Sequence, residues 1–161
     1  MLDGGAERLR RRVPTPQGGY DDVVVAVRDL ALALEREAGA PATVGIGTPG
    51  SLSATTGLLR NSNSIALNGR PFARDIAAAL DREVRIANDA DCFSLSEAAD
   101  RAGAGHRVVF GVILGTGVGG GIVVDGRLWT GGNGIAGEWG HNLLAPRDGE
   151  AAPRCWCGRS G

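Results

Sequence analysis

The residues with the clearest chemical potential lie near the end of the chain, in the stretch Gly134–His141 and in the pair Cys155-Trp-Cys157. The first stretch supplies a carboxylate at Glu138 and an imidazole at His141, and the pair supplies two thiols. One histidine and a Cys-x-Cys pair make three ligands of the kind that zinc prefers, whereas a closed structural zinc site has four. The sequence therefore predicts a zinc site formed by His141, Cys155 and Cys157, with a fourth ligand expected after Gly161.

A second candidate is the glycine-rich stretch Leu114–Gly121. Its glycines, among them Gly115, Gly117 and Gly119, would let backbone N–H groups converge on a phosphate, and Thr116 adds a hydroxyl donor. No helix follows and no Gly-Lys-Ser/Thr is present, so neither a dinucleotide fingerprint nor a Walker loop is matched. The stretch fits a phosphate-binding turn and a plain glycine-rich hairpin equally well.

The third candidate, Asn88-Asp-Ala-Asp91, follows a short apolar run that is typical of a buried strand. The carboxyl ends of such strands are where open α/β sheets bind ligands. Asp89 could serve there as a general base toward a substrate hydroxyl, with Asn88 holding a neighbouring hydroxyl, or it could simply cap the next helix. The amides of Asn61, Asn63 and Asn68 suit sugar hydroxyls, although asparagine is also a common turn residue.

Periodicity and turn residues place these candidates on an α/β framework. Helices are expected at Tyr20–Ala38, Pro71–Glu83 and Ala90–Ala102, and strands at Glu7–Val13, Thr43–Gly47, Val84–Ala87, Val108–Leu114 and Gly121–Val124. Asp125-Gly126 is typical of a two-residue hairpin turn, Gly57–Asn68 of an irregular loop, and Cys92 of a core position on its helix. A change of texture near Ala104 predicts two lobes, residues 1–104 and 105–161.

Composition excludes several classes of function. The formal charge is −1 and the only basic cluster is Arg8–Arg12, so no nucleic-acid partner is expected. The uncharged run Val108–Val124 is too short for a membrane-spanning helix and is interrupted by glycines, so no membrane partner is expected either. No apolar signal segment follows Met1, and the three cysteines suit a metal site in a reducing cytoplasm better than a disulfide framework.

Taken in order, the segments resemble the ROK family of bacterial sugar kinases and sugar-responsive repressors. The resemblance is carried by five motifs, in the order Gly45-Ile-Gly-Thr-Pro-Gly50, Asn88-Asp-Ala-Asp91, Leu114-Gly-Thr-Gly-Val-Gly119, Gly137-Glu-Trp-Gly-His141 and Cys155-x-Cys-Gly158. It implies part of an actin-like, two-lobed fold of the hexokinase/Hsp70 type, related to ribonuclease H, with ATP, Mg²⁺ and a hexose as ligands.

The resemblance also implies a role for each candidate. Asp89 matches the base that deprotonates the 6-hydroxyl of the sugar, and Asn63, Asn88, Glu138 and His141 match sugar contacts. Gly115, Thr116, Gly117 and Gly119 match a phosphate loop, and His141, Cys155 and Cys157 match ligands of a structural zinc. A homodimer of the full-length protein is left open.

Fructose is the favoured hexose at this stage, because three segments resemble fructokinases of the family. They are Asn61–Phe72, the Glu-Trp-Gly-His-Asn form at Glu138–Asn142, and Pro153-Arg-Cys-Trp-Cys157. Kinases of N-acetylglucosamine, glucose or mannose are alternatives, as is a non-catalytic regulator or a sugar-binding remnant.

The Asp-x-Gly-Gly-Thr-Lys loop of the family is not matched at Met1–Ala6, and the remainder of the second lobe is not found after Gly161. The chain by itself is therefore expected to be a poor catalyst.

Overall fold

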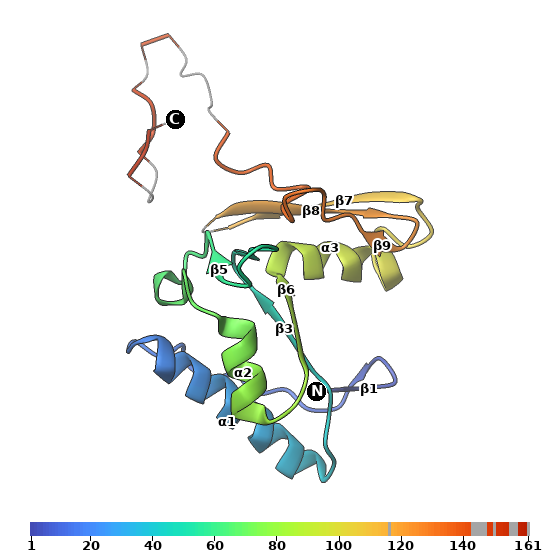
Figure 1. Cartoon of the computed structure of the whole chain (residues 1–161). Coiled ribbons are helices and arrows are strands. Elements are labelled where there is room, and N and C mark those ends of the chain that lie inside the picture. The colour runs from blue at the N-terminus through green and yellow to red at the C-terminus, as the bar shows by residue number, and fades with distance from the viewer. Residues whose placement is uncertain (116, 143–147, 150, 155–157, 161) are drawn as a thin grey trace. The chain divides into compact units, whose positions relative to one another are not determined.

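The structure is a computed structural model of the chain and describes every residue except 116, 143–147, 150, 155–157 and 161 (Figure 1). It divides into two compact units, Met1–Asp89 and Ala90–Gly161. The first unit holds β1 (Leu2–Asp3), β2 (Ala6–Glu7), α1 (Tyr20–Ala38), β3 (Val44–Thr48), β4 (Ser51–Leu52), β5 (Leu59–Arg60), the 3-10 helix η1 (Ile65–Leu67), α2 (Phe72–Leu80) and β6 (Val84–Asn88). The chain continues with α3 (Asp89–Asp100), β7 (Val108–Leu114), β8 (Val118–Val124) and β9 (Arg127–Leu128).

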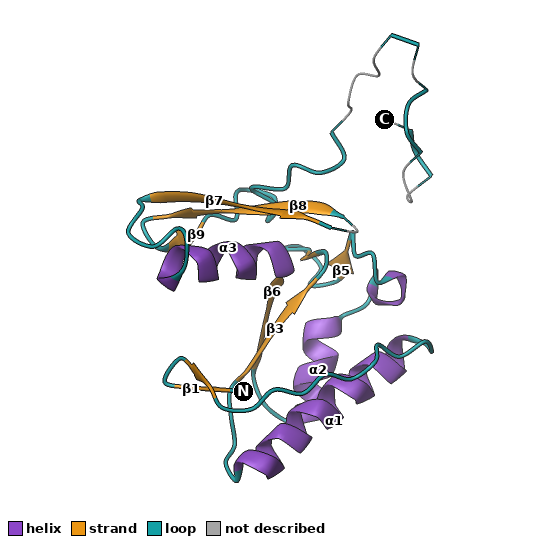
Figure 2. Cartoon of the chain, turned by 180° about the vertical axis from the view of Figure 1, so that it is seen from behind, coloured by secondary structure: helices purple, strands orange, loops and turns teal. Residues whose placement is uncertain are grey.

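The first unit is built on the parallel pair of β3 and β6, covered on one face by α1 and α2 (Figure 2). In both strands the residues alternate between half-buried and exposed, with Val44, Ile46, Val84 and Ile86 turned toward the helices. This alternation is the period of a strand with one packed face. The buried core comprises Tyr20, Leu59, Leu67, Phe72, Ile76 and Leu80.

Helix α1 has recognisable signals at both ends. The backbone N–H of Gly19 donates to the Asp22 carboxylate at 3.0 Å, and Asp21 and Asp22 put negative charge in the first turn, where the helix dipole favours it. The helix ends at Gly39, whose φ of 69° lies in the left-handed region that glycine adopts readily. These signals explain why the predicted helix, Tyr20–Ala38, has the observed bounds.

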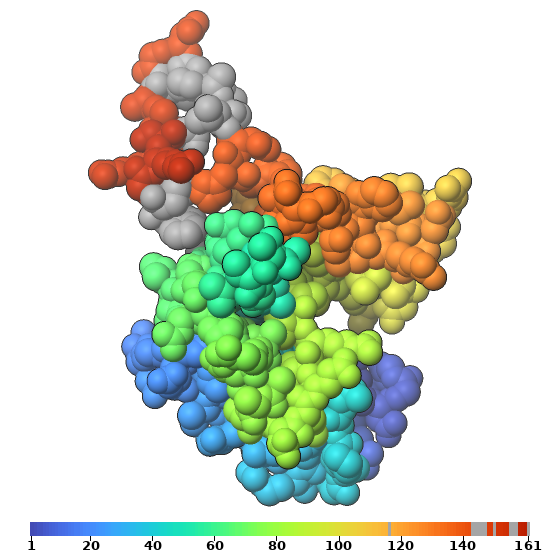
Figure 3. Space-filling view, viewed as in Figure 1, coloured from blue at the N-terminus to red at the C-terminus, as the bar shows by residue number. Residues whose placement is uncertain are grey.

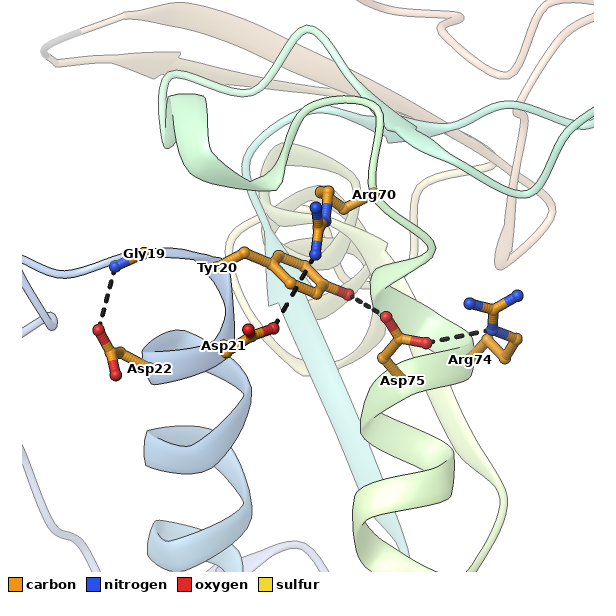
Figure 4. A network of polar contacts seen from close by, with 7 residues as sticks. All are labelled: Gly19, Tyr20, Asp21, Asp22, Arg70, Arg74 and Asp75. Carbon is orange, nitrogen blue, oxygen red and sulfur yellow. Dashed lines mark hydrogen bonds and ion pairs between the residues drawn. The ribbon is translucent and has the colours of Figure 1, made fainter.

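Tyr20 joins α1 to α2 (Figure 4). Its hydroxyl donates to the Asp75 carboxylate at 2.8 Å, its ring meets Phe72 edge-on at 6.3 Å between centroids, and the Arg70 guanidinium lies 4.1 Å from its ring centre. Burial, and then the bond to Asp75, raises the pKa of Tyr20, and the same bond lowers the pKa of Asp75. Both shifts keep the neutral phenol beside the ionised carboxylate.

An ion pair joins the end of α1 to the starts of both core strands. Arg82, two residues before β6, donates to the two carboxylate oxygens of Glu35 at 2.6 and 2.8 Å. Glu35 also accepts the backbone N–H of Ala42, and Arg82 donates to the Ala42 carbonyl, so the residue two places before β3 belongs to the same cluster. A two-bond arginine–carboxylate pair of this kind fixes direction as well as distance.

In the second unit α3 packs against a three-stranded antiparallel sheet of order β7-β8-β9. The approach is close because Gly111 and Gly121, which are paired across β7 and β8, lie under the helix. A Cβ built on Gly111 would lie 2.1 Å from the Ser94 hydroxyl oxygen, and one on Gly121 would lie 2.7 Å from it. Ser94 is fully buried and donates to the Ala90 carbonyl at 2.7 Å, so the buried hydroxyl has a partner.

The structure confirms most of the expected elements and corrects three expectations. The strand predicted at Glu7–Val13 is not observed. The strand ends at Glu7, because Ala6–Glu7 pairs only with Leu2–Asp3 in a short hairpin. The loop Gly57–Asn68 contains β5 and η1. Cys92 is exposed, because Ala90 and Ser94 form the buried side of α3 and a residue midway between them faces the other way.

The turn Asp125-Gly126 is confirmed, with φ of 49° and 73°. Both angles are positive, as a two-residue turn of type I′ requires. The division into compact units falls in the chain after Asp89, and α3 groups with β7–β9 because the glycines of the sheet receive it. The lobe boundary near Ala104 stays a prediction. None of the helices in the described part of the chain is long and apolar enough to cross a membrane.

We expect the stability of the first unit to depend on pH through Glu35. The bonds from Arg82, and then from Ala42, lower the pKa of Glu35 to about 2. A carboxyl whose pKa is lowered by folding stabilises the fold above its unfolded pKa, and this contribution is lost as the pH falls through the folded pKa. Glu35→Gln should therefore lower the melting temperature by several degrees at pH 7 and by progressively less between about pH 5 and pH 2.

Circular dichroism melts at several pH values would measure this difference. The matched control is Glu83→Gln, because Glu83 is 82% exposed and pairs with Arg85 at 3.5 Å at the surface. An equal loss at all pH values in the Glu35 variant would contradict the assignment.

A methyl group at position 121 should push α3 away from the sheet. Its carbon would lie 2.7 Å from Ser94 Oγ and 3.1 Å from the Cα of Asp91, both of which are too close. Gly121→Ala should cost about 1–3 kcal/mol of unfolding free energy, measured by urea denaturation. Gly119→Ala, in the same strand, meets nothing nearer than 3.5 Å and should change stability by about 0.5 kcal/mol or less. Equal stability of the two variants would contradict the close packing.

Candidate active site

The parallel register brings the ends of β3 and β6 together. Thr48 lies opposite Asn88, and the Asn88 side-chain amide donates to the Gly50 carbonyl at 3.0 Å. Asn88 therefore ties the turn after β3 to the end of β6. The sequence predicted Asn88 as a sugar contact, and in the structure its amide nitrogen also has this positioning role.

Gly50 in turn determines where the following loop lies. Its φ is 85°, and a Cβ there would lie 2.4 Å from the Arg60 carbonyl oxygen and 2.9 Å from the Ser62 nitrogen. Only glycine allows both the left-handed backbone and this close approach. The backbone at Arg60–Ser62 is thereby packed directly on the turn that Asn88 holds.

The loop Asn61–Asn68 is closed by one side chain. Asn68 accepts the backbone N–H of Ser62 and donates to the Ser62 carbonyl, both at 2.8 Å. Ser62 is buried, and its hydroxyl accepts the backbone N–H of Ser64 at 3.1 Å. Asn63 lies between these two residues and is exposed. The segment between β4 and α2, in green, reaches the surface of the first unit (Figure 3).

The three asparagines of this loop therefore differ in role. Asn61 occupies the left-handed region, with φ of 57°. Asn68 makes the two hydrogen bonds to the Ser62 backbone, which we call the Asn68 clasp. Both fit the interpretation as turn residues, whereas the exposed amide of Asn63 stays a predicted sugar contact. The clasp could not be predicted, because nothing in the local sequence relates Asn68 to Ser62.

Asp89 is the first residue of α3 and is exposed. A carboxylate in the first turn of a helix is stabilised by the helix dipole. The position suits both interpretations of the sequence, a helix-capping residue and a general base, and the catalytic role stays a prediction.

The predicted phosphate turn connects β7 to β8. Gly115 donates its N–H to the Gly117 carbonyl at 2.9 Å, and both glycines are exposed. A Cβ on either would meet no atom within 4 Å, so the backbone here is open to a ligand. Thr116 lies outside the described residues. The described part is a glycine-rich hairpin, and phosphate binding stays a prediction.

The segment carrying Glu138 runs along the edge of β8. A Cβ on Gly119 would lie 3.5 Å from Glu138 Oε1 and 3.5 Å from the Cβ of Ala90, so the carboxylate lies near both the glycine-rich turn and the first turn of α3. The Trp139 indole N–H donates to the Gly119 carbonyl at 2.9 Å. The sequence motif pointed to Glu138 but gave no sign of what Trp139 binds.

The spacing of Glu138 and His141 suggested that they share a helical turn. In the structure they do not. The segment is a series of turns, and His141 has a left-handed φ of 58° and is exposed. Cys155 and Cys157 lie outside the described residues. Among the residues that the structure does describe, no group of three or more His, Cys, Asp or Glu side chains could hold a metal, so the zinc site stays a prediction.

A sequence model of the ROK family matches residues 2–161. The chain belongs to the ROK family. This confirms the resemblance and the predicted α/β fold class, that of the actin-like, hexokinase-type kinases.

Individual members of the ROK family are also similar to this chain in sequence and structure. An N-acetyl-D-glucosamine kinase of Pectobacterium atrosepticum is 45% identical over 159 residues, which cover 94% of this chain and 52% of the relative. The chain thus spans about half the length of the curated relatives that it matches. A ROK hexokinase from Thermus thermophilus has a TM-score of 0.74 and 36% identity, covering 92% of this chain and 49% of that one.

A ROK glucokinase from Streptomyces griseus, solved with glucose and AMPPNP, also has a TM-score of 0.74, with 27% identity over 92% of this chain and 46% of its own.

Loss of the Asn68 clasp should loosen the loop that presents Asn63. Asn68→Ala removes both partners of the Ser62 backbone, so the Ser62 amide should exchange with solvent at least about tenfold faster. Amide hydrogen exchange followed by NMR would measure this rate. Asn63→Ala, in the same loop, removes an exposed side chain and should leave it unchanged. Unchanged exchange in the Asn68 variant would contradict the clasp.

Proposed function

We propose that this chain provides the sugar-binding and phosphate-binding segments of a ROK kinase that phosphorylates N-acetylglucosamine at its 6-hydroxyl, with ATP as the donor. The observation that carries the proposal is the proximity of Glu138, Gly119 and the first turn of α3. A carboxylate suited to sugar hydroxyls, a backbone suited to phosphates and the helix that begins with Asp89 are needed together for phosphoryl transfer.

Asp89 would accept the proton of the sugar's 6-hydroxyl as the hydroxyl oxygen attacks the γ-phosphorus of ATP. The bond from that phosphorus to the bridging oxygen would break, and ADP would leave. Glu138 and His141 would bind other hydroxyls of the sugar, together with Asn63 and Asn88. The open backbone at Gly115 and Gly117, with Gly119 beside it at the start of β8, would receive phosphate oxygens, and Mg²⁺, when bound, would neutralise their charge. Zinc itself, with His141, Cys155 and Cys157 as the ligands proposed on sequence, would take no part in the chemical step.

The choice of hexose differs from the one that the motifs favoured. The sequence favoured fructose, but the matched curated relatives are named N-acetyl-D-glucosamine kinases, and one similar solved structure is a glucokinase holding glucose. Because hydroxyl-binding residues alone separate similar hexoses weakly, identity to these relatives is the better guide. N-acetylglucosamine is thus the proposed substrate and glucose the second candidate.

Calorimetric titration of the chain with four hexoses tests the substrate. We expect N-acetylglucosamine to bind at least about tenfold more tightly than fructose, with glucose and mannose between them. Tightest binding of fructose would restore the expectation from the motifs. Absence of binding by every hexose would contradict the proposed function.

The role of Asp89 is tested in a longer protein, in which this chain replaces the matching half of the Pectobacterium kinase. Asp89→Asn should lower the kcat for ADP release by about 10²-fold or more and leave sugar binding largely intact, because a base acts on the proton in the transition state. The matched control is Asp100→Asn, at the exposed far end of the same helix. Equal kcat in both variants would remove Asp89 from the mechanism.

A further inference from the structure

Trp139 connects two segments that the proposed function uses for different ligands. It follows Glu138, a proposed sugar contact, and its indole N–H donates to the carbonyl of Gly119, the last residue of the proposed phosphate turn, at 2.9 Å. This bond runs between side chain and backbone across residues that are distant in sequence. It is the kind of contact by which a change in one segment can reach the other.

The backbones on either side of Trp139 touch the same strand. A Cβ on Gly140 would lie 2.3 Å from the Val118 carbonyl oxygen, and one on Gly137 would lie 2.8 Å from the Cα of Gly121. At Gly137 and Gly140 the backbone of the segment 137–140 therefore lies directly on β8. Close-packed contacts of this kind leave no room for one segment to shift alone.

The orientation of the Gly119 peptide is the quantity that Trp139 controls. Gly119 is paired with Ile113 at the start of β8, and the indole bond adds a second restraint on its peptide, directly after the open turn at Gly115 and Gly117. Glu138 is the residue before Trp139, and its carboxylate lies 3.5 Å from the position of a Cβ on Gly119. A ligand that orders Glu138 thus also orders the phosphate turn, and the reverse holds by thermodynamic linkage.

From this geometry we propose that Trp139 is a positioning residue that couples nucleotide binding to sugar binding through the Gly119 carbonyl. The inference rests on the proposed function. The bound sugar fixes the segment 137–140, the indole holds the Gly119 peptide, and the turn then presents its N–H groups to phosphate in one arrangement. Each ligand consequently increases the affinity for the other.

Trp139→Phe tests the coupling, because it keeps an aromatic ring and removes the N–H donor. The dissociation constant of N-acetylglucosamine would be measured on the chain with and without saturating Mg²⁺–AMPPNP. In the wild type the nucleotide should tighten sugar binding at least about fivefold, and in Trp139→Phe the ratio should fall toward one. A merely structural role would lower stability and leave this ratio unchanged.

The matched control is Trp129→Phe. Trp129 is 59% exposed, and its backbone N–H, which the substitution keeps, is the group that donates to Ile122, at 2.7 Å. This variant should retain the wild-type ratio. The chain has three tryptophans, so the two variants also assign the indole resonances in an NMR spectrum. The Trp139 resonance should shift on addition of either ligand alone.

The outcomes separate the two proposals. If the wild-type chain binds no hexose, the proposed function fails. If it binds hexose but with a ratio of one, or if Trp139→Phe keeps the wild-type ratio, the proposed function stands and the coupling through Trp139 is overturned.

Discussion

The parallel register of β3 and β6, in which Val44 faces Val84 and Thr48 faces Asn88, is the constraint on which the first unit depends. It places Asn88 where its amide reaches the Gly50 carbonyl, and Gly50 is packed on the backbone that leads to Asn63. It also sets the point at which the chain leaves β6 and begins α3 with Asp89. A slip of one residue would turn the side chains of β6 to the opposite face and separate these groups.

The ion pair of Glu35 and Arg82 stabilises this register at the opposite ends of the two strands, where β3 and β6 begin. Arg82 lies just before β6, and both partners bind the backbone of Ala42 just before β3. A cluster that holds the starting points of both strands favours the observed register. Tyr20, with its bonds to α2, then keeps the two helices over the same face of the strands. Polar groups at the opposite ends of β3 and β6 from Thr48 and Asn88 thus support the geometry of the first unit.

In the second unit, glycines rather than polar side chains bring the segments together. Gly111 and Gly121 let α3 lie against the sheet, and Gly137 and Gly140 let the segment with Glu138 lie against β8. Glycine is usually a liability in a strand because it adds flexibility and has no side chain to pack. Here the contacts around it restrict that flexibility, and the missing side chains make room for the Glu138 carboxylate beside Gly119 and the glycine-rich turn.

The sequence by itself determined the family, the helix Tyr20–Ala38, the core strands and the list of residues that could do chemistry, because periodicity, turn residues and ordered motifs are local properties of a chain. Only the tertiary structure decided the different surroundings of Asn61, Asn63 and Asn68, the exposure of Cys92 and the bond of Trp139 to Gly119. Each of these depends on which backbone lies opposite a side chain. The backbone partner is distant in sequence, and the side of α3 that is buried depends on what packs against the helix. Local sequence patterns therefore could not predict these features.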